Sequence, residues 1–175
     1  RIPVSVNLPV SLLDRPQLPD ELYEQVTHSG IPAEDVTFEL LEDDMTVAPG
    51  NYYMGASRLR LKGFGLSQDD FGKGYSSMYS LISTPFTELK IDRAFVHGAA
   101  GVSSVQLGRQ LGLQVTAEGV ETLDDLQFLR RIGCDFVQGF LISAAVDLAA
   151  FNALLANEPG HGAMRDPAPR QAIRD

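Results

Sequence analysis

The chain reads Asp69-Asp70-Phe71-Gly72 after the short apolar run 64–66, and Leu89-Lys90-Ile91-Asp92 at the end of a second apolar run, 86–89. Charged residues therefore stand where two neighbouring predicted strands end. In an alternating β/α chain the loops after the strands gather at one face, and active sites are built there. Two adjacent aspartates repel each other unless they are solvated, protonated or bound to a metal ion. The motif predicts a catalytic rim, although a solvated turn that caps a helix would use the same residues.

The same alternation runs along the rest of the chain. Six short runs of strand-forming residues each precede a polar or charged residue: 4–8, 36–41, 64–66, 86–89, 113–117 and 136–137. Apolar residues at helical spacing predict helices over residues 19–28, 74–82, 103–111 and 122–132. Thr122 is the expected N-cap of the last helix. Strands separated by helices predict a parallel sheet with right-handed crossovers.

In this order, the motifs resemble those of the bacterial EAL domains, over residues 1 to about 150. The matching motifs are Val-Asn-Leu with Asn7, Glu42 at the end of the second strand, Asp69-Asp70-Phe71-Gly72 with Gly74-Tyr75-Ser76-Ser77, Leu89-Lys90-Ile91-Asp92, Ala117-Glu118-Gly119-Val120-Glu121-Thr122 and Gln138-Gly139-Phe140. EAL domains resemble a TIM barrel and hydrolyse cyclic di-GMP. The resemblance implies an α/β fold, a TIM-like (β/α) barrel fragment of the EAL type over residues 1–156. Residues 157–175 are rich in Pro, Gly, Arg and Asp, which predicts a disordered C-terminal tail.

The chain departs from the family pattern at its start and at one connection. The family's name-giving Glu-Ala-Leu strand and the strand before it are missing, so the chain opens at what would be the third family strand. The stretch from His97 to Val105 is shorter by roughly eight to ten residues than the family's usual connection, which puts the crossover helix there in question. The missing Glu-Ala-Leu strand removes one metal ligand from the expected site.

The acids at the predicted strand ends suit a site for two divalent metal ions. A phosphodiester is negatively charged and resists attack by water, whereas two hard ions about 3.5–4 Å apart bridge its oxygens and acidify the attacking water. Mg²⁺ and Mn²⁺ prefer carboxylate, amide-carbonyl and water oxygens. The strand ends would supply such ligands from Asn7, Glu42, Asp69, Asp70 and Glu118. Asp69 is the natural bridging ligand because one carboxylate has two oxygens.

The resemblance implies further roles around these ligands. Lys90 and Gln138 would hold the attacking water, and a charged Lys90 would stabilise hydroxide or the transition state. Glu118 would serve both catalysis and metal binding. Residues expected to support the loop or the substrate are Phe71, Gly72, Gly74, Ser76, Asp92 and Glu121. Glu121 would brace the loop after the paired aspartates or, alternatively, cap the next helix, and Gln138 could instead satisfy buried backbone groups.

The candidate ligands also have purely structural interpretations. Asn7 could bond a turn backbone, and Glu42 lies in an acidic run that would usually be a solvated face. Lys90 could form a structural ion pair with Asp69 or Glu118. Taken singly, most of these interpretations are preferable, but the ordered set favours the functional one.

The composition narrows the class of protein and its partners. The chain has 175 residues, is 44% hydrophobic, and has no apolar run near the roughly 18 residues that a membrane span needs. A net charge of −9 argues against a long nucleic acid as partner, but not against a small dinucleotide held through metal ions. Cys134 is the only cysteine, so no disulfide framework is expected and a cytoplasmic location is predicted.

We therefore expect the parent protein to be a phosphodiesterase that uses two Mg²⁺ or Mn²⁺ ions to hydrolyse cyclic di-GMP to linear pGpG in bacterial second-messenger signalling. We also expect a homodimer, regulatory domains elsewhere in the parent chain, and no membrane contact from this segment. The main alternative is a catalytically inactive EAL domain that acts as a cyclic di-GMP receptor or a protein-interaction module. An unrelated metal-dependent barrel enzyme that acts through enolates would share the acid-and-lysine rim.

Overall fold

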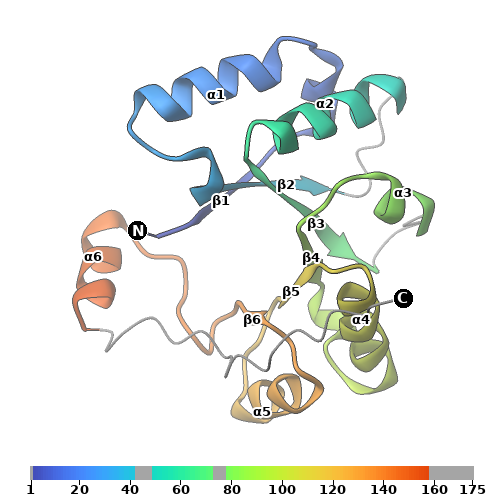
Figure 1. Cartoon of the computed structure of the whole chain (residues 1–175). Helices are drawn as coiled ribbons and strands as arrows, with labels where there is room; N and C mark the ends of the chain where they lie inside the picture. Colours follow the sequence, from blue (N-terminus) through green and yellow to red (C-terminus); the bar gives the residue numbers. More distant parts are fainter. Residues whose placement is uncertain (1, 42–48, 73–77, 158–175) are drawn as a thin grey trace, which may run out of the picture.

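The computed structural model of the chain describes residues 2–41, 49–72 and 78–157. Its strands are β1 (Val4–Asn7), β2 (Val36–Leu41), β3 (Gly65–Phe71), β4 (Glu88–Ile91), β5 (Gln114–Ala117) and β6 (Phe136–Val137). Within the described residues they form one six-stranded sheet in sequence order, and every neighbouring pair is parallel. The sheet curves into part of a barrel with the helices outside it (Figure 1). This arrangement confirms the predicted TIM-like barrel fragment.

Helices α1 to α5 lie in the crossovers between successive strands, and α6 follows the last strand. They are α1 (Leu18–His28), α2 (Pro49–Leu61), α3 (Met78–Ser83), α4 (Gly98–Gln110), α5 (Leu123–Ile132) and α6 (Leu148–Asn157), with short 3-10 turns η1 (Val10–Asp14), η2 (Ala33–Asp35) and η3 (Arg93–Phe95). The predictions over 19–28 and 122–132 are confirmed. The helix predicted over 103–111 begins earlier, at Gly98, so the short connection does hold a crossover helix. Part of the helix predicted over 74–82 lies outside the described residues.

Helices α2 and α6 were not predicted, because neither has a clear apolar stripe. The buried face of α2 consists of Tyr52, Gly55, Ala56 and Leu59, and small residues weaken its pattern. Helix α6 is apolar on most sides, so no single face stands out. It ends at Asn157, and the rest of the predicted tail lies outside the described residues.

The predicted N-cap at Thr122 is confirmed and forms a reciprocal capping box. The hydroxyl of Thr122 accepts a hydrogen bond from the backbone N–H of Asp125 at 3.1 Å, and the carboxylate of Asp125 accepts one from the backbone N–H of Thr122 at 3.1 Å. Gly133 ends the helix with φ +78°, a left-handed conformation that glycine adopts without steric cost. The cap fixes the path of the chain just after β5.

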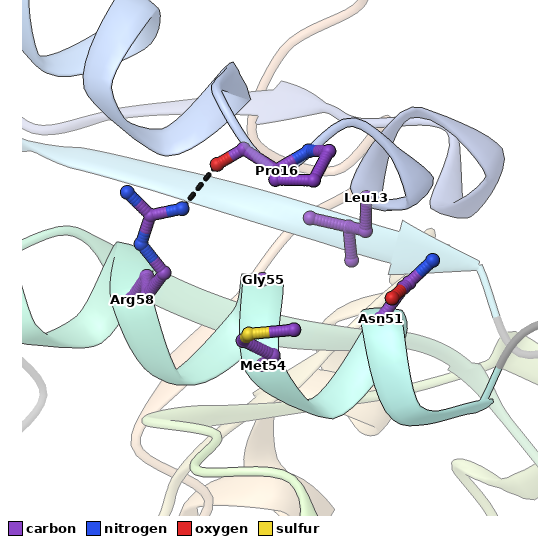
Figure 2. Close-up of a pocket in the computed structure, with 6 residues that line it drawn as sticks. All are labelled: Leu13, Pro16, Asn51, Met54, Gly55 and Arg58. Atoms are coloured by element: carbon purple, nitrogen blue, oxygen red, sulfur yellow. Dashed lines mark hydrogen bonds between the residues drawn. The ribbon is translucent and has the colours of Figure 1, made fainter.

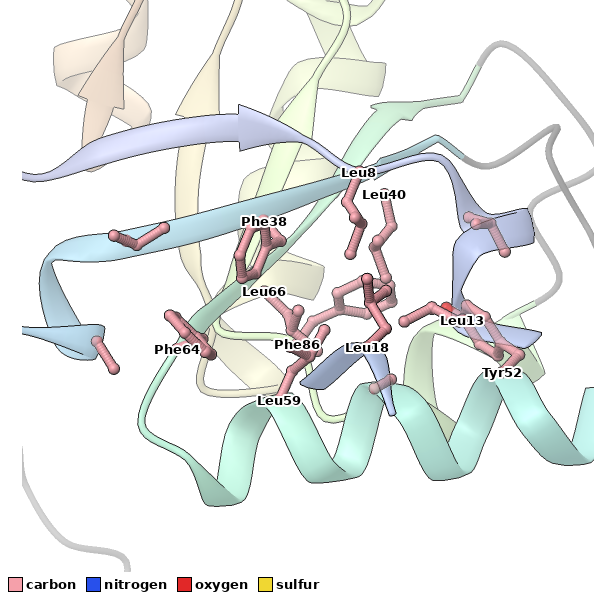
Figure 3. Packing of buried hydrophobic residues seen from close by; sticks show 14 of the residues in the cluster. Leu8, Leu13, Leu18, Phe38, Leu40, Tyr52, Leu59, Phe64, Leu66 and Phe86 are labelled. Atoms are coloured by element: carbon pink, nitrogen blue, oxygen red, sulfur yellow. The ribbon is translucent and has the colours of Figure 1, made fainter. Parts of the chain in front are cut away.

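The core lies between the sheet and the helices, not inside the barrel. Phe38 and Leu40 from β2 and Leu66 from β3 are buried against Leu59 of α2 (Figure 3). A second buried cluster packs α4 and α5 onto β4 and β5; it contains Ile91, Val96, Val105, Val115, Ala117, Val120, Leu129 and Cys134. Because side chains alternate along a strand, the residues between these apolar positions face the inside of the barrel. On β2 to β5 these inner positions include the polar residues Thr37, Glu39, Ser67, Lys90 and Thr116.

The two edge strands of the sheet, β1 and β6, leave apolar side chains exposed. Val4 and Val6 of β1 are 46% and 47% exposed, and Phe136 of β6 is 43% exposed. Leu148 of α6 is also exposed. Among the described residues, no helix combines the length and the apolar character that crossing a membrane requires.

Candidate metal centre

Three carboxylates surround one buried lysine at the carboxyl end of the sheet. The Nζ atom of Lys90 lies 2.6 Å from Oε1 of Glu118, 2.9 Å from Oε1 of Glu39 and 3.4 Å from Oδ1 of Asp69. The lysine side chain is only 5% exposed. One ammonium group offsets only one of these negative charges. The site therefore keeps an excess of buried negative charge, which favours a cation.

The register of the sheet explains why these residues meet. Glu39 of β2 pairs with Ser67 of β3, and Asp69 lies two residues further along the same face. Lys90 of β4 pairs with Thr116 of β5, and Glu118 again follows two residues later. Parallel strands end at the same edge, so four strands deliver these side chains to one place.

A β-bulge brings the second aspartate into the same site. The pairing of β3 with β4 shifts register between Gln68 and Phe71, and Asp70 has φ +53°. In a regular strand Asp69 and Asp70 would point to opposite faces, but a bulge re-aims the extra residue. One carboxylate oxygen each from Asp69, Asp70 and Glu118 lies within 4.8 Å of the other two, and the three could hold a metal ion. The backbone N–H of Asp70 also donates to Oδ1 of Asp69 at 3.0 Å.

Burial and the neighbouring charges shift the pKa values of Lys90 and Glu118. Burial alone would lower the pKa of Lys90, but its hydrogen bonds to Glu118 and Glu39, with the charges of Glu118 and Asp69, raise that pKa above its ordinary value. Burial raises the pKa of Glu118; the charges of Asp69 and Glu39 raise it further, while Lys90 lowers it. The lysine is thus held charged and the acids repel one another. A divalent cation would relieve that repulsion.

The predicted ligands are placed as follows. Asp69, Asp70 and Glu118 lie together, and Asn7 ends β1 opposite Glu39 in the register. Glu42 lies outside the described residues. Glu39 was not predicted as a site residue. Its position between the outward-facing Phe38 and Leu40 is the signal that could have found it, because this alternation directs it to the inner face.

The supporting residues lie around this centre. Gln138 is exposed just after β6; its backbone N–H donates to the carbonyl of Ala117 at 2.8 Å, and its carbonyl accepts from Val120 at 3.0 Å. Asp92 caps η3 by accepting from the N–H of Ala94 at 2.9 Å. Glu121 pairs with Arg93, with Nη2 to Oε2 at 2.9 Å. Phe71 and Gly72 are half-buried at the end of β3, and Gly74 and Ser76 lie outside the described residues.

A separate small pocket lies on the helical side of the sheet, between η1 and α2 (Figure 2). It is lined by Leu13, Pro16, Asn51, Met54, Gly55 and Arg58. The Arg58 guanidinium donates to the Pro16 carbonyl and contacts Oδ2 of Asp20 at 2.6 Å. None of these lining residues carries a carboxylate, and the one charged residue among them, Arg58, is already paired. We assign the pocket no role.

Comparison with known proteins points to one family. The sequence model of the EAL domain matches residues 1–145. The chain is 36% identical over 163 residues to the cyclic di-GMP phosphodiesterase NbdA of Pseudomonas aeruginosa, covering 89% of this chain and 21% of NbdA. The chain thus spans about a fifth of the length of this curated relative.

Solved structures share the fold. The PaMucR phosphodiesterase in complex with c-di-GMP superposes with a TM-score of 0.77 and 31% identity, covering 85% of this chain and 70% of that one. The Klebsiella pneumoniae protein BlrP1, in a manganese and cyclic di-GMP complex, gives a TM-score of 0.73 and 28% identity, covering 81% of this chain and 38% of that one. With its parallel barrel strands and its acidic centre around a buried lysine, the chain belongs to the EAL domain family.

Proposed function

We propose that the protein is a phosphodiesterase that hydrolyses cyclic di-GMP to linear pGpG with two divalent metal ions. The observation that carries the proposal is the acidic centre itself, with Asp69, Asp70 and Glu118 clustered beside Lys90. Membership of the EAL family, and relatives named as cyclic di-GMP phosphodiesterases, support the substrate. The structures of relatives with bound cyclic di-GMP support it too.

The donor set fits hard divalent ions. The clustered groups are carboxylates, with the further carboxylate of Glu39 beside them and the amide of Asn7 at the same sheet edge. Oxygen donors of this kind suit Mg²⁺ or Mn²⁺ better than softer metals. We propose that Asn7, Glu39, Asp69, Asp70 and Glu118 hold the ions, with Glu42 as a further ligand. Bound ions would polarise the phosphodiester and lower the pKa of a nearby water.

The remaining roles fall to the protein's own side chains. Lys90 is charged and fixed by Glu39, Asp69 and Glu118, so it can steady the attacking water and the negative charge that develops on the phosphate. We propose that Gln138 also positions the attacking water, since its backbone is hydrogen-bonded to Ala117 and Val120, just before and just after Glu118 and Gly119. The low exposure of the lysine strengthens its electrostatic effect.

Hydrolysis assays on matched variants test this proposal. Asp70→Asn and Glu118→Gln should each reduce conversion of cyclic di-GMP to pGpG by at least about 100-fold in the intact protein. Glu21→Gln is the control, because Glu21 pairs with Arg15 on the surface of α1. Conversion would be followed chromatographically with Mg²⁺ and, separately, with Mn²⁺. If the wild-type protein binds cyclic di-GMP tightly but does not cleave it, the receptor hypothesis replaces the enzyme hypothesis.

We further propose that the whole protein is a cytoplasmic homodimer with regulatory domains outside this chain. The small share of NbdA that the chain covers supports additional domains. Met78, Tyr79 and Ile82 of α3 are exposed apolar side chains that suit a self-association surface. Sedimentation of the intact protein, compared with its Tyr79→Ser variant, tests the dimer, and a wild-type monomer would contradict it.

A further inference from the structure

The 3-10 turn η3 (Arg93–Phe95) lies between the two loops that carry the acidic centre. It follows β4, the strand that carries Lys90, and the Asp92 carboxylate caps it. One loop is the end of β3, at Asp70 and Gly72. The other follows β5. Side chains of η3 contact both loops, and neither contact is part of the acidic cluster.

The first contact is made by Arg93 on the loop after β5. Gly119 has φ +64°, and a Cβ placed there would lie 2.8 Å from Cβ of Arg93. The stem of Arg93 is therefore packed directly on the backbone of the residue after Glu118. Its guanidinium donates hydrogen bonds to the Glu121 carboxylate from both terminal nitrogens, Nη1 and Nη2, with Nη2 at 2.9 Å from Oε2. Lys90 and Arg93 thus hold this loop on either side of Gly119.

The second contact is made by Phe95 on the end of β3. Gly72 has φ +106°, and a Cβ placed there would lie 2.7–2.9 Å from three ring atoms of Phe95. The ring therefore packs against the backbone just past Asp70, whose own left-handed φ of +53° needs support from its surroundings. No side chain larger than hydrogen fits at Gly72 without displacing the ring.

We propose that η3 is a clamp that sets the spacing between Asp70 and Glu118, with Arg93 and Phe95 as positioning residues for the metal centre. The inference rests on the proposed function in that the spaced groups are taken to bind divalent ions. The acids repel one another, so without the clamp their loops would relax apart. Residues that orient metal ligands from behind typically change metal affinity by about 10–100-fold when they are altered.

The test measures Mn²⁺ affinity of the intact protein by calorimetry, beside its thermal unfolding midpoint. Arg93→Gln should weaken Mn²⁺ binding by about 10-fold or more. Arg15→Gln is the matched control. Arg15 and Arg93 are 54% and 62% exposed, and each contacts both carboxylate oxygens of a glutamate, Arg15 through Nη2 alone and Arg93 through Nη1 and Nη2. Both substitutions should move the unfolding midpoint equally little, because exposed ion pairs contribute little stability.

Three further variants separate positioning from a general structural effect. Arg93→Lys keeps the positive charge but loses the two-nitrogen hydrogen bonding to Glu121, so this variant should bind Mn²⁺ with intermediate affinity. Phe95→Leu should also weaken Mn²⁺ binding, whereas Phe128→Leu, at a half-buried phenylalanine of α5, should not. Unchanged Mn²⁺ affinity in Arg93→Gln and Phe95→Leu would overturn the clamp and leave the proposed function in place. A wild-type protein that binds no Mn²⁺ would overturn the proposed function and the clamp with it.

Discussion

Replacing Lys90 with methionine removes the only ammonium group in contact with Glu39, Asp69 and Glu118 within the described residues. The apolar stem of the side chain is kept, so packing changes little. The three carboxylate side chains are only 12%, 13% and 19% exposed and would lose their counter-charge. Breaking a buried ion pair on one side costs about 3–5 kcal/mol. For a chain of this size that is a fall in the unfolding midpoint of roughly 6–20 °C.

The loss should depend on pH in a definite direction. The raised pKa of Lys90 keeps it charged through neutral pH, so its stabilising effect is constant there. The pKa of Glu118 is already raised, and a group of this kind favours folding when protonated and loses that contribution as pH rises through its folded pKa. Without Lys90 this pKa should rise further. The Lys90→Met variant should therefore recover stability as pH falls from 8 towards 5, and on addition of Mn²⁺.

The assay is thermal unfolding of the intact protein at several pH values, with and without Mn²⁺. Lys62→Met is the control, because Lys62 contacts the half-exposed Asp20 at 2.6 Å on the outside of the sheet. That change should shift the midpoint much less and should not respond to Mn²⁺. Equal stability of wild type and Lys90→Met at pH 8 would refute the reasoning that the lysine is the counter-ion of a buried acidic centre.

Three further outcomes follow from the geometry. Asp70→Gly should preserve thermal stability, because glycine adopts φ +53° freely, yet it should abolish Mn²⁺ binding in calorimetry. Asp70→Val should lose both stability and Mn²⁺ binding, and equal stability of the two variants would contradict the strained bulge. Burial raises the pKa of the Cys134 thiol to about 11, so a thiol reagent at pH 8 should react far more slowly with native protein than with protein unfolded in urea, and fast native labelling would be evidence against this environment. Residues 1–175 alone should self-associate and be catalytically poor, because Val4 and Val6 are nearly half exposed on an edge strand; sedimentation showing a cooperatively folding monomer as active as a longer parent would disprove this.

The sequence alone was sufficient for the order of the strands, most of the helices and the family. Alternating apolar runs and polar ends predict a parallel β/α chain whatever the details of packing. The Thr122 cap could be predicted too, because a capping box depends only on residues three positions apart. The paired aspartates could be singled out because they are adjacent in sequence.

The membership of the acidic centre was decided by the tertiary structure. Glu39 joins it through sheet register, and Asp70 through a bulge that a one-dimensional pattern does not reveal. The pairing of Arg93 with Glu121 likewise joins residues from two different crossovers. Local spacing determines which way a side chain points along its own strand. Only the pairing of strands, and the curvature that brings their ends together, determines which charges share a site.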